Sequence, residues 1–346
     1  MSKRTFAVSA NAVRANTLVE RLQKTLVDNL SQISSRLGDG SAFIPVEWIR
    51  AEGLCGGGVR YMAADNKLFN RASVNVSHIH YSDLPEKALD SATALSTIVH
   101  PLNPHAPSMH MHISWTEMKG GKGYWRIMAD LNPSIPLQSA TDTFTASLKD
   151  AAQAQYQEAS TQGDRYFHIP ALDRHRGVSH FYLENYCTAD AEADYALAES
   201  VGDAVIQCYS RLLAEAVENN PKPSDQDFQQ QLAYHTLYLF QVLTLDRGTT
   251  SGLLVHNQND IGILGSLPSH VDRDLLASWK QKVESPQDNL VEAIIEAMPE
   301  LSPCPIDDNV KQALADGVRN HYQTYPQALE LQARGAVIPP TVQNHS

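Results

Sequence analysis

The sequence predicts an α+β protein built around an antiparallel β-sheet. Several segments alternate apolar and polar residues, which is the period-two pattern of strands. Other segments repeat apolar residues every three or four positions, as helices do. The two kinds of segment do not alternate regularly along the chain. This disfavours a doubly wound parallel sheet and favours an antiparallel one.

The expected elements follow from these patterns and from the glycines and prolines that end them. Apolar residues at helical spacing predict a first helix over residues 11–37, which Gly38 and Gly40 stop. Strands are expected at 72–80, 110–115, 124–131, 176–186 and, interrupted at 246–248, at 237–263. Further helices are expected at 140–161, 190–219, 275–298 with a break at Pro286, and 307–322. The last dozen residues are expected to form a frayed tail.

Composition narrows the classes of function. The 346 residues are 42% hydrophobic and 19% charged, an ordinary globular balance, and the formal net charge is −12. This charge disfavours a nucleic-acid partner, and the absence of a long apolar run predicts no membrane insertion and no signal peptide. The four cysteines lie far apart without a CxxC pair: Cys55, Cys187, Cys208 and Cys304. They predict reduced thiols and a cytoplasmic protein.

The chemistry-bearing feature of the sequence is its 14 histidines. Walker and GxSxG motifs are absent, so nucleotide-binding and hydrolase folds of those types are disfavoured. His78/His80 and His110/His112 have i, i+2 spacing, which places both rings of a pair on one face of a strand. Two such rings can converge on one metal or substrate, although hydrogen-bonded structural histidines produce the same pattern.

A series of short motifs runs from about residue 46 to about residue 268 and resembles one known family in order and spacing. The motifs are Cys55-Gly-Gly-Gly, Val74-Asn-Val-Ser-His-Ile-His, Ser96-Thr-Ile-Val-His-Pro, Asn103-Pro-His-Ala-Pro, His110-Met-His, Asp130-Leu-Asn-Pro, Arg176-Gly, Asp246-Arg-Gly-Thr and Ser266-Leu-Pro. Together they resemble the oxygen-dependent coproporphyrinogen III oxidases.

The resemblance implies a large flat antiparallel β-sheet flanked by helices on both sides, and a homodimer. It implies an oxygen-dependent oxidoreductase that decarboxylates propionate side chains oxidatively, with molecular oxygen as co-substrate and no organic cofactor. Residues 1–302 are then expected to form a single domain of this type. Residues 303–346 extend beyond the resemblance as a C-terminal helical extension and tail.

Carried over by position, the resemblance assigns roles to individual residues. His110 becomes the catalytic histidine, and Asp130 becomes the aspartate that holds pyrrole N–H groups. Histidine can move protons near neutral pH, and a buried carboxylate can stabilise positive charge on a pyrrole. The resemblance also implies substrate contacts at these positions: Ser96, Ser114, Arg176, Asn257 and Gln258.

The chain departs from the family pattern where a substrate would be held. Ser114 stands in place of an arginine, and Gln258 in place of another. A glycine run of the family is replaced by Arg126-Ile-Met. Arginine forks bind carboxylates, and bare glycine backbone lets a flat ligand approach closely. We therefore expect a small-molecule substrate other than a porphyrinogen.

Strand parity adds a hypothesis about a metal. Three histidines absent from the family pattern, His112, His180 and His256, fall with His110 on positions expected to face the pocket. Imidazole-rich sites suit redox metals, so we predict an iron or copper centre ligated by three or four of these residues, with Glu184 or Asp130 as a carboxylate partner. The alternative is that the histidines hydrogen-bond a polar substrate.

Two other functions remain open. The chain could be an authentic coproporphyrinogen III oxidase of haem biosynthesis, converting propionates to vinyl groups despite these substitutions. It could also be a non-catalytic binding protein that kept the fold. Retention of both His110 and Asp130 favours an enzyme over the binding protein.

Overall fold

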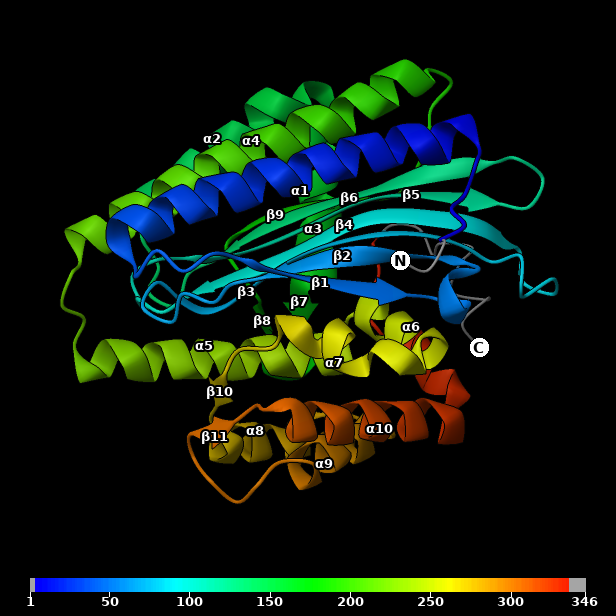
Figure 1. Cartoon of the computed structure of the whole chain (residues 1–346). Helices are drawn as coiled ribbons and strands as arrows, with labels where there is room; N and C mark the ends of the chain where they lie inside the picture. Colours follow the sequence, from blue (N-terminus) through cyan, green and yellow to red (C-terminus); the bar gives the residue numbers. More distant parts are fainter. Residues whose placement is uncertain (1–3, 336–346) are drawn as a thin grey trace.

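The computed structural model describes residues 4–335 and is built on one seven-stranded sheet. The sheet order is β1-β2-β3-β4-β5-β6-β9, and every neighbouring pair is antiparallel. Helices lie on both faces of the sheet, as Figure 1 shows, so the predicted α+β class is confirmed. The strands are β1 (Ile44–Ile49), β2 (Gly56–Met62), β3 (Phe69–His80), β4 (Leu89–Pro101), β5 (Ser108–Met118), β6 (Gly123–Asn132) and β9 (Ser179–Tyr186).

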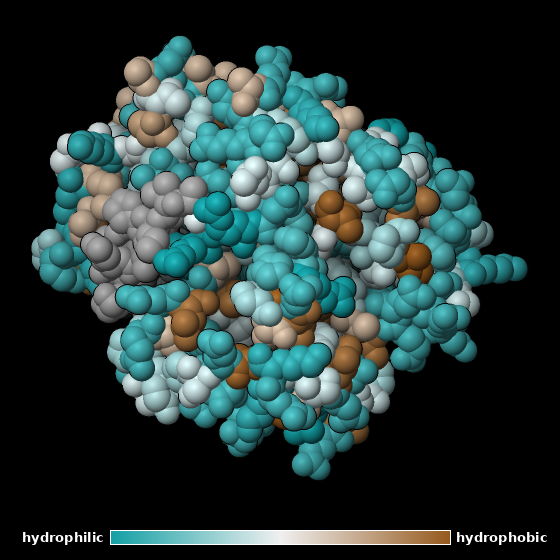
Figure 2. Space-filling model, turned by 180° about the vertical axis from the view of Figure 1, so that it is seen from behind, coloured by the Kyte–Doolittle hydropathy of each residue, from teal (hydrophilic) through white to brown (hydrophobic). Residues whose placement is uncertain are grey.

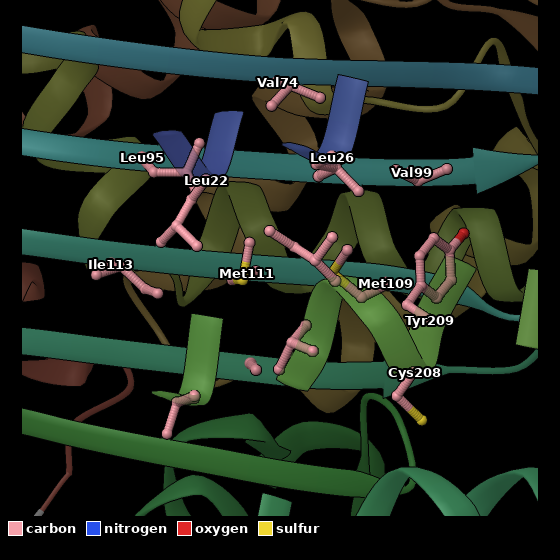
Figure 3. Packing of buried hydrophobic residues seen from close by; sticks show 14 of the residues in the cluster. Leu22, Leu26, Val74, Leu95, Val99, Met109, Met111, Ile113, Cys208 and Tyr209 are labelled. Carbon is pink, nitrogen blue, oxygen red and sulfur yellow. The ribbon is translucent and has the colours of Figure 1, made fainter. Parts of the chain in front are cut away.

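One face of the sheet is covered by long amphipathic helices. Helix α1 begins after Ser9, whose side chain accepts a hydrogen bond from the Ala12 N–H, and it ends at Gly38. Its apolar stripe packs on the sheet: Leu22 lies in one core cluster with Leu95 and Met111 (Figure 3). The helices on this face are α1 (Ala10–Leu37), α2 (Gln138–Ala152) and α4 (Ala191–Asn219), whereas α3 (Tyr156–Phe167) packs against β9, with Gly163 beside His180.

The helix predicted over residues 140–161 is two helices. Helix α2 ends at Gln153, whose positive φ of 45° interrupts the helical path before α3 begins. The first helix and the helix predicted over 190–219 are confirmed as α1 and α4.

The opposite face of the sheet carries α5 (Asp225–Thr244), α6 (Arg247–Val255) and α7 (Asp260–Ile263). The strand predicted over 237–263 is therefore wrong. Every residue from 234 to 244 is buried, because α5 lies between the sheet and a further layer of helices (Figure 1). A helix buried on all sides loses its polar stripe, so its sequence is hard to distinguish from that of a buried strand.

The C-terminal part packs below α5 around a second apolar cluster. The helices predicted near 275–298 and 307–322 are confirmed, and the first is divided at Pro286 as expected. The domain boundary predicted near residue 303 stays a prediction. Residues 270–271, before this boundary, pair as a short strand with residues 304–305, after it. These elements are α8 (Arg273–Trp279), α9 (Gln287–Glu296), α10 (Asp308–Thr324) and the short pair β10 (His270–Val271) with β11 (Cys304–Pro305). A second short pair, β7 (His168–Ile169) with β8 (Arg174–His175), lies between α3 and β9 in the chain.

Four further observations concern the chain and its surface. Residues 336–346, which include most of the predicted tail, lie outside the described part of the chain. Within residues 4–335, no helix combines the length and apolar character needed to cross a bilayer. The four cysteines are free thiols. Hydrophilic residues dominate the face seen in Figure 2, with hydrophobic residues scattered among them, as is usual for protein surfaces.

The packing of α1 on the sheet gives a stability prediction. Leu22 is fully buried, so Leu22→Ala should lower the free energy of unfolding by about 2–5 kcal/mol through lost burial and a cavity. Urea denaturation monitored by circular dichroism measures this change. Val13 is half exposed on the same helix, and Val13→Ala is the matched control, expected to change stability little. Equal effects of the two substitutions would contradict the packing described here.

Candidate active site

Two adjoining cavities lie between the sheet and the helices α5, α6 and α7. Their volumes are about 240 and 230 Å³, and both are lined by His112, Arg126 and His256. Because they share these walls, we describe them as the first and second cavities of one cleft. Pockets for drug-sized ligands span ~300–1,000 Å³, so the two cavities together suit one small molecule.

The first cavity has a hydrogen-bonded network at its wall. Sheet register places His110 of β5 directly opposite Asp130 of β6, and the His110 Nδ1 lies 2.9 Å from Asp130 Oδ1. The second carboxylate oxygen of Asp130 accepts a hydrogen bond of 2.8 Å from Arg176 Nη2. Arg176 also donates to Gln241 Oε1 of α5 at 2.7 Å. His110 lines the cavity, so this buried network ends at the place where a ligand would bind.

Electrostatics fix the proton positions in this network. Burial alone would raise the pKa of Asp130, but the Arg176 guanidinium and the His110 ring outweigh it and hold that pKa below the ordinary value. Asp130 is therefore an anion that can only accept hydrogen bonds. The Nδ1 of His110 must then carry a proton and donate it to Asp130. The Nε2 of His110 is left as the ring nitrogen that can exchange a proton with a ligand.

His112 is a neutral neighbour of this network. Burial lowers the pKa of His112 well below its usual value, and the charges on Arg126 and His110 lower it further. Its Nε2 lies 3.0 Å from the hydroxyl of Ser114. The uncharged ring lines both cavities, where it can exchange hydrogen bonds with a polar ligand.

The four histidines predicted to ligate a metal do not come together. His180 is 4% exposed, and its two ring nitrogens each lie 2.7 Å from an oxygen, one on the side chain of Asp164 and one on the backbone of Arg176. It lines neither cavity. His256 does line the cleft, but it follows helix α6 and not the predicted strand.

The residues present do not fit the predicted iron or copper centre. Across residues 4–335, no group of three or more His, Cys, Asp or Glu side chains is arranged to hold a metal ion. The physical reason lies in His180, whose nitrogens are both engaged, and in Asp130, whose oxygens already bind His110 and Arg176.

The predicted substrate contacts are divided by the structure. Ser96 lines the first cavity, and Ser114 lines the second. Arg176 reaches the first cavity, but its Nη1 and Nη2 atoms already donate to Gln241 and Asp130, and only Nε lacks a partner among the described residues. Gln258 is exposed and belongs to neither wall, and nothing is described for the side chain of Asn257.

Sequence reasoning missed three arginines that line the cleft: Arg60, Arg126 and Arg247. Arg126 on β6 lies directly opposite Ser114 on β5, so the neighbouring strand supplies a guanidinium to the wall where position 114 lacks one. Burial would lower the pKa of Arg126, but Tyr166, Glu184 and Asp246 raise it overall. Arg126 and Asp130 are four residues apart on one strand, so their side chains point to the same face of the sheet. This spacing was the sequence signal that could have placed Arg126 at the cleft.

A polar cleft of small-molecule size with a buried histidine–aspartate pair at its wall is typical of an enzyme that acts on a small molecule. Comparison with known proteins makes this specific. The family model described as coproporphyrinogen III oxidase matches residues 14–299. The chain belongs to the coproporphyrinogen III oxidase family, as the sequence motifs predicted.

Curated relatives have the corresponding names. The chain is 26% identical over 311 residues to the rat protein named oxygen-dependent coproporphyrinogen-III oxidase, mitochondrial, covering 82% of this chain and 68% of the relative. The human protein of the same name is 27% identical over 311 residues, covering 82% and 66%. The Drosophila melanogaster oxygen-dependent coproporphyrinogen-III oxidase is 28% identical over 270 residues, covering 71% and 68%. The chain thus spans about two thirds of these relatives, whose shared activity supports an oxidoreductase.

The buried network gives a prediction about stability and pH. Asp130→Asn removes the anion that pairs with buried Arg176 and should lower the free energy of unfolding by about 3–5 kcal/mol near neutral pH. The lowered pKa of Asp130 stabilises the fold above the unfolded-state pKa of about 3.9, and this contribution is lost as the pH falls through the folded-state value. Denaturant titrations at several acidic pH values should therefore show that the difference in free energy of unfolding between wild type and Asp130→Asn decreases as the pH falls. Asp150→Asn, at an exposed position, is the control; a constant gap between wild type and Asp130→Asn would contradict the assignment.

Proposed function

We propose that this chain is an oxygen-dependent oxidoreductase acting on a small polar substrate bound in the cleft. One observation carries the proposal: the buried Arg176–Asp130–His110 network ends at the wall of the first cavity. In this proposal His110 is the catalytic residue that exchanges a proton with the substrate. Asp130 positions the His110 ring, and Ser96 contacts the bound molecule.

The proton chemistry follows from the geometry. Asp130 holds the Nδ1–H of His110, so Nε2 has the free lone pair that accepts a proton. The imidazolium formed in that step would be stabilised by the Asp130 carboxylate. Arg176 keeps Asp130 ionised throughout, because it lowers the pKa of that carboxyl. Molecular oxygen is the proposed electron acceptor: it takes two electrons from the substrate and two protons, and leaves as hydrogen peroxide.

The substrate separates two versions of the proposal. Arg126 and Met128 occupy wall positions where the family resemblance expects glycine, and their side chains narrow the space for a flat macrocycle. This supports a non-porphyrin substrate, oxidised or oxidatively decarboxylated. The alternative is authentic coproporphyrinogen III oxidation, which the relatives' printed names and the arginine at position 126 favour. The third candidate, a binding protein without catalysis, is disfavoured because binding alone does not require His110 to be held in one tautomer.

The histidines predicted as metal ligands are better suited to hydrogen bonding than to metal coordination. His112 is neutral and bonded to Ser114, and His180 is held by Asp164 and the Arg176 carbonyl. The proposal therefore contains no step at iron or copper. Free cysteines are consistent with the cytoplasm as the proposed compartment.

Turnover gives the main prediction. The purified protein should consume oxygen and release peroxide with a single pyrrole bearing a propionate side chain, the group that the family resemblance implies is decarboxylated, and should not convert coproporphyrinogen III to protoporphyrinogen. Replacing the proton-transfer group by His110→Asn should lower the rate by a factor of ~10²–10⁴. An oxygen electrode and mass spectrometry of products measure both outcomes.

The control is His105→Asn, in a loop away from the cleft, which should keep the wild-type rate. Formation of protoporphyrinogen would favour the authentic alternative. No oxygen uptake with either compound would count against catalysis on this substrate class, and an unchanged rate in His110→Asn would remove His110 from the proposed role.

We also propose that the chain forms a homodimer, as the family resemblance implies. Strand β1 is the last strand at one edge of the sheet, and it exposes Ile44, Val46 and Ile49. Exposed apolar edge strands favour association with another chain. Light scattering should give twice the 38.1 kDa chain mass. The pair Ile44→Asp and Val46→Asp should shift the mass to that of one chain, whereas a monomeric wild type would contradict the proposal.

A further inference from the structure

Two buried arginines of the cleft make no ion pair with a described residue, unlike Arg126 and Arg176. Arg60 of β2 lines the first cavity and Arg247 of α6 lines the second, and each is only 6% exposed. Among the described residues, no hydrogen-bond partner faces Nε of Arg60, or Nε and Nη1 of Arg247. Arg60 has one long bond of 3.2 Å from Nη2 to the side chain of Asn259.

Other buried arginines of this protein are paired with acids. Arg176 donates to Asp130 at 2.8 Å, and Arg50 donates to Asp83 at 2.7 Å. Burying a guanidinium without an anion is costly, and burial lowers the pKa of both Arg60 and Arg247. A positive group kept in a cavity at such a cost needs a partner from outside the fold. A carboxylate matches the planar fork of N–H groups that arginine presents.

The local structure preserves space for Arg60 and keeps Arg247 only partly neutralised. A Cβ atom at Gly262 would lie 2.1 Å from Nη2 of Arg60, so a larger residue there would displace that guanidinium from its present position. Glu184 also lines the second cavity and attracts Arg247. Burial raises the pKa of Glu184, and its carboxylate accepts a hydrogen bond from Tyr182. Even beside Glu184, the Nε and Nη1 donors of Arg247 have no hydrogen-bond partner among the described residues.

The positions of the two arginines limit the shape of the ligand. Arg60 belongs only to the first cavity and Arg247 only to the second, whereas His112 lines both. We propose that the cleft binds a small dicarboxylate, one carboxylate on Arg60 and the other on Arg247, with the body of the molecule passing His112. This inference rests on the proposed function and deepens it, because it names the substrate class of the same cleft.

Binding can be tested without turnover. The probes are the α,ω-dicarboxylates from succinate to suberate, with butyrate as the monocarboxylate and inorganic phosphate as a different anion. Isothermal titration calorimetry should show at least one dicarboxylate binding ten-fold or more tightly than butyrate and phosphate. Arg60→Met and Arg247→Met should each weaken that dicarboxylate ten-fold or more, to the level of butyrate. Arg211→Met, on the exposed surface of α4, should leave it unchanged.

Folding of the variants is checked in the same experiment. Because each substitution removes an incompletely paired buried charge, the melting temperature of the ligand-free variants should not fall below that of the wild type. Arg60→Lys and Arg247→Lys keep a charge without the fork and should restore binding only in part.

Three results would overturn the inference: no dicarboxylate preference over butyrate, phosphate binding as tightly as any dicarboxylate, or a preference that survives either methionine substitution. Failure of the proposed function is distinct, because it would appear as dicarboxylate binding without oxygen uptake.

Discussion

The buried ion pair between Arg176 and Asp130 is the interaction on which the rest of the site depends. Both side chains are almost completely enclosed, and removing either would leave a charge in a medium that cannot solvate it. Their pairing connects β6 to the turn before β9, and the bond from Arg176 to Gln241 extends it to α5 on one face of the sheet. The same pair fixes the proton on His110. Stability and proposed chemistry therefore share one set of atoms.

The turn that presents Arg176 has its own supports. Gly177 has a φ of 80°, and a Cβ there would lie 2.7 Å from the carbonyl oxygen of Leu131. His180 holds the Arg176 carbonyl through one ring nitrogen and Asp164 through the other. Both ring nitrogens of His180 are therefore engaged by oxygen atoms of the fold itself. This accounts for a histidine at a buried position without invoking a metal.

The two faces of the sheet have different roles: one forms the apolar core and the other lines the cleft. Along β5, Met111 and Ile113 point into the apolar core beneath α1 and α4, whereas His110 and His112 point into the cleft. Because successive side chains point to opposite faces, one strand contributes to the apolar core on one side and to the cleft on the other. Register between strands then decides which polar groups meet. It puts Arg126 opposite Ser114, so a guanidinium absent from one strand is supplied by the next.

The sequence by itself determined the class of fold, most of the elements and the family, because these depend on local periodicity and on short motifs. It also placed His110 and Asp130 in one site through the family resemblance. Tertiary structure decided the remainder. Helix α5 was misjudged because burial on all sides removes the polar stripe that marks a helix. The partners of His180, and the arginines that face the cleft without full pairing, follow from contacts between residues distant in sequence, and no local pattern reports those contacts.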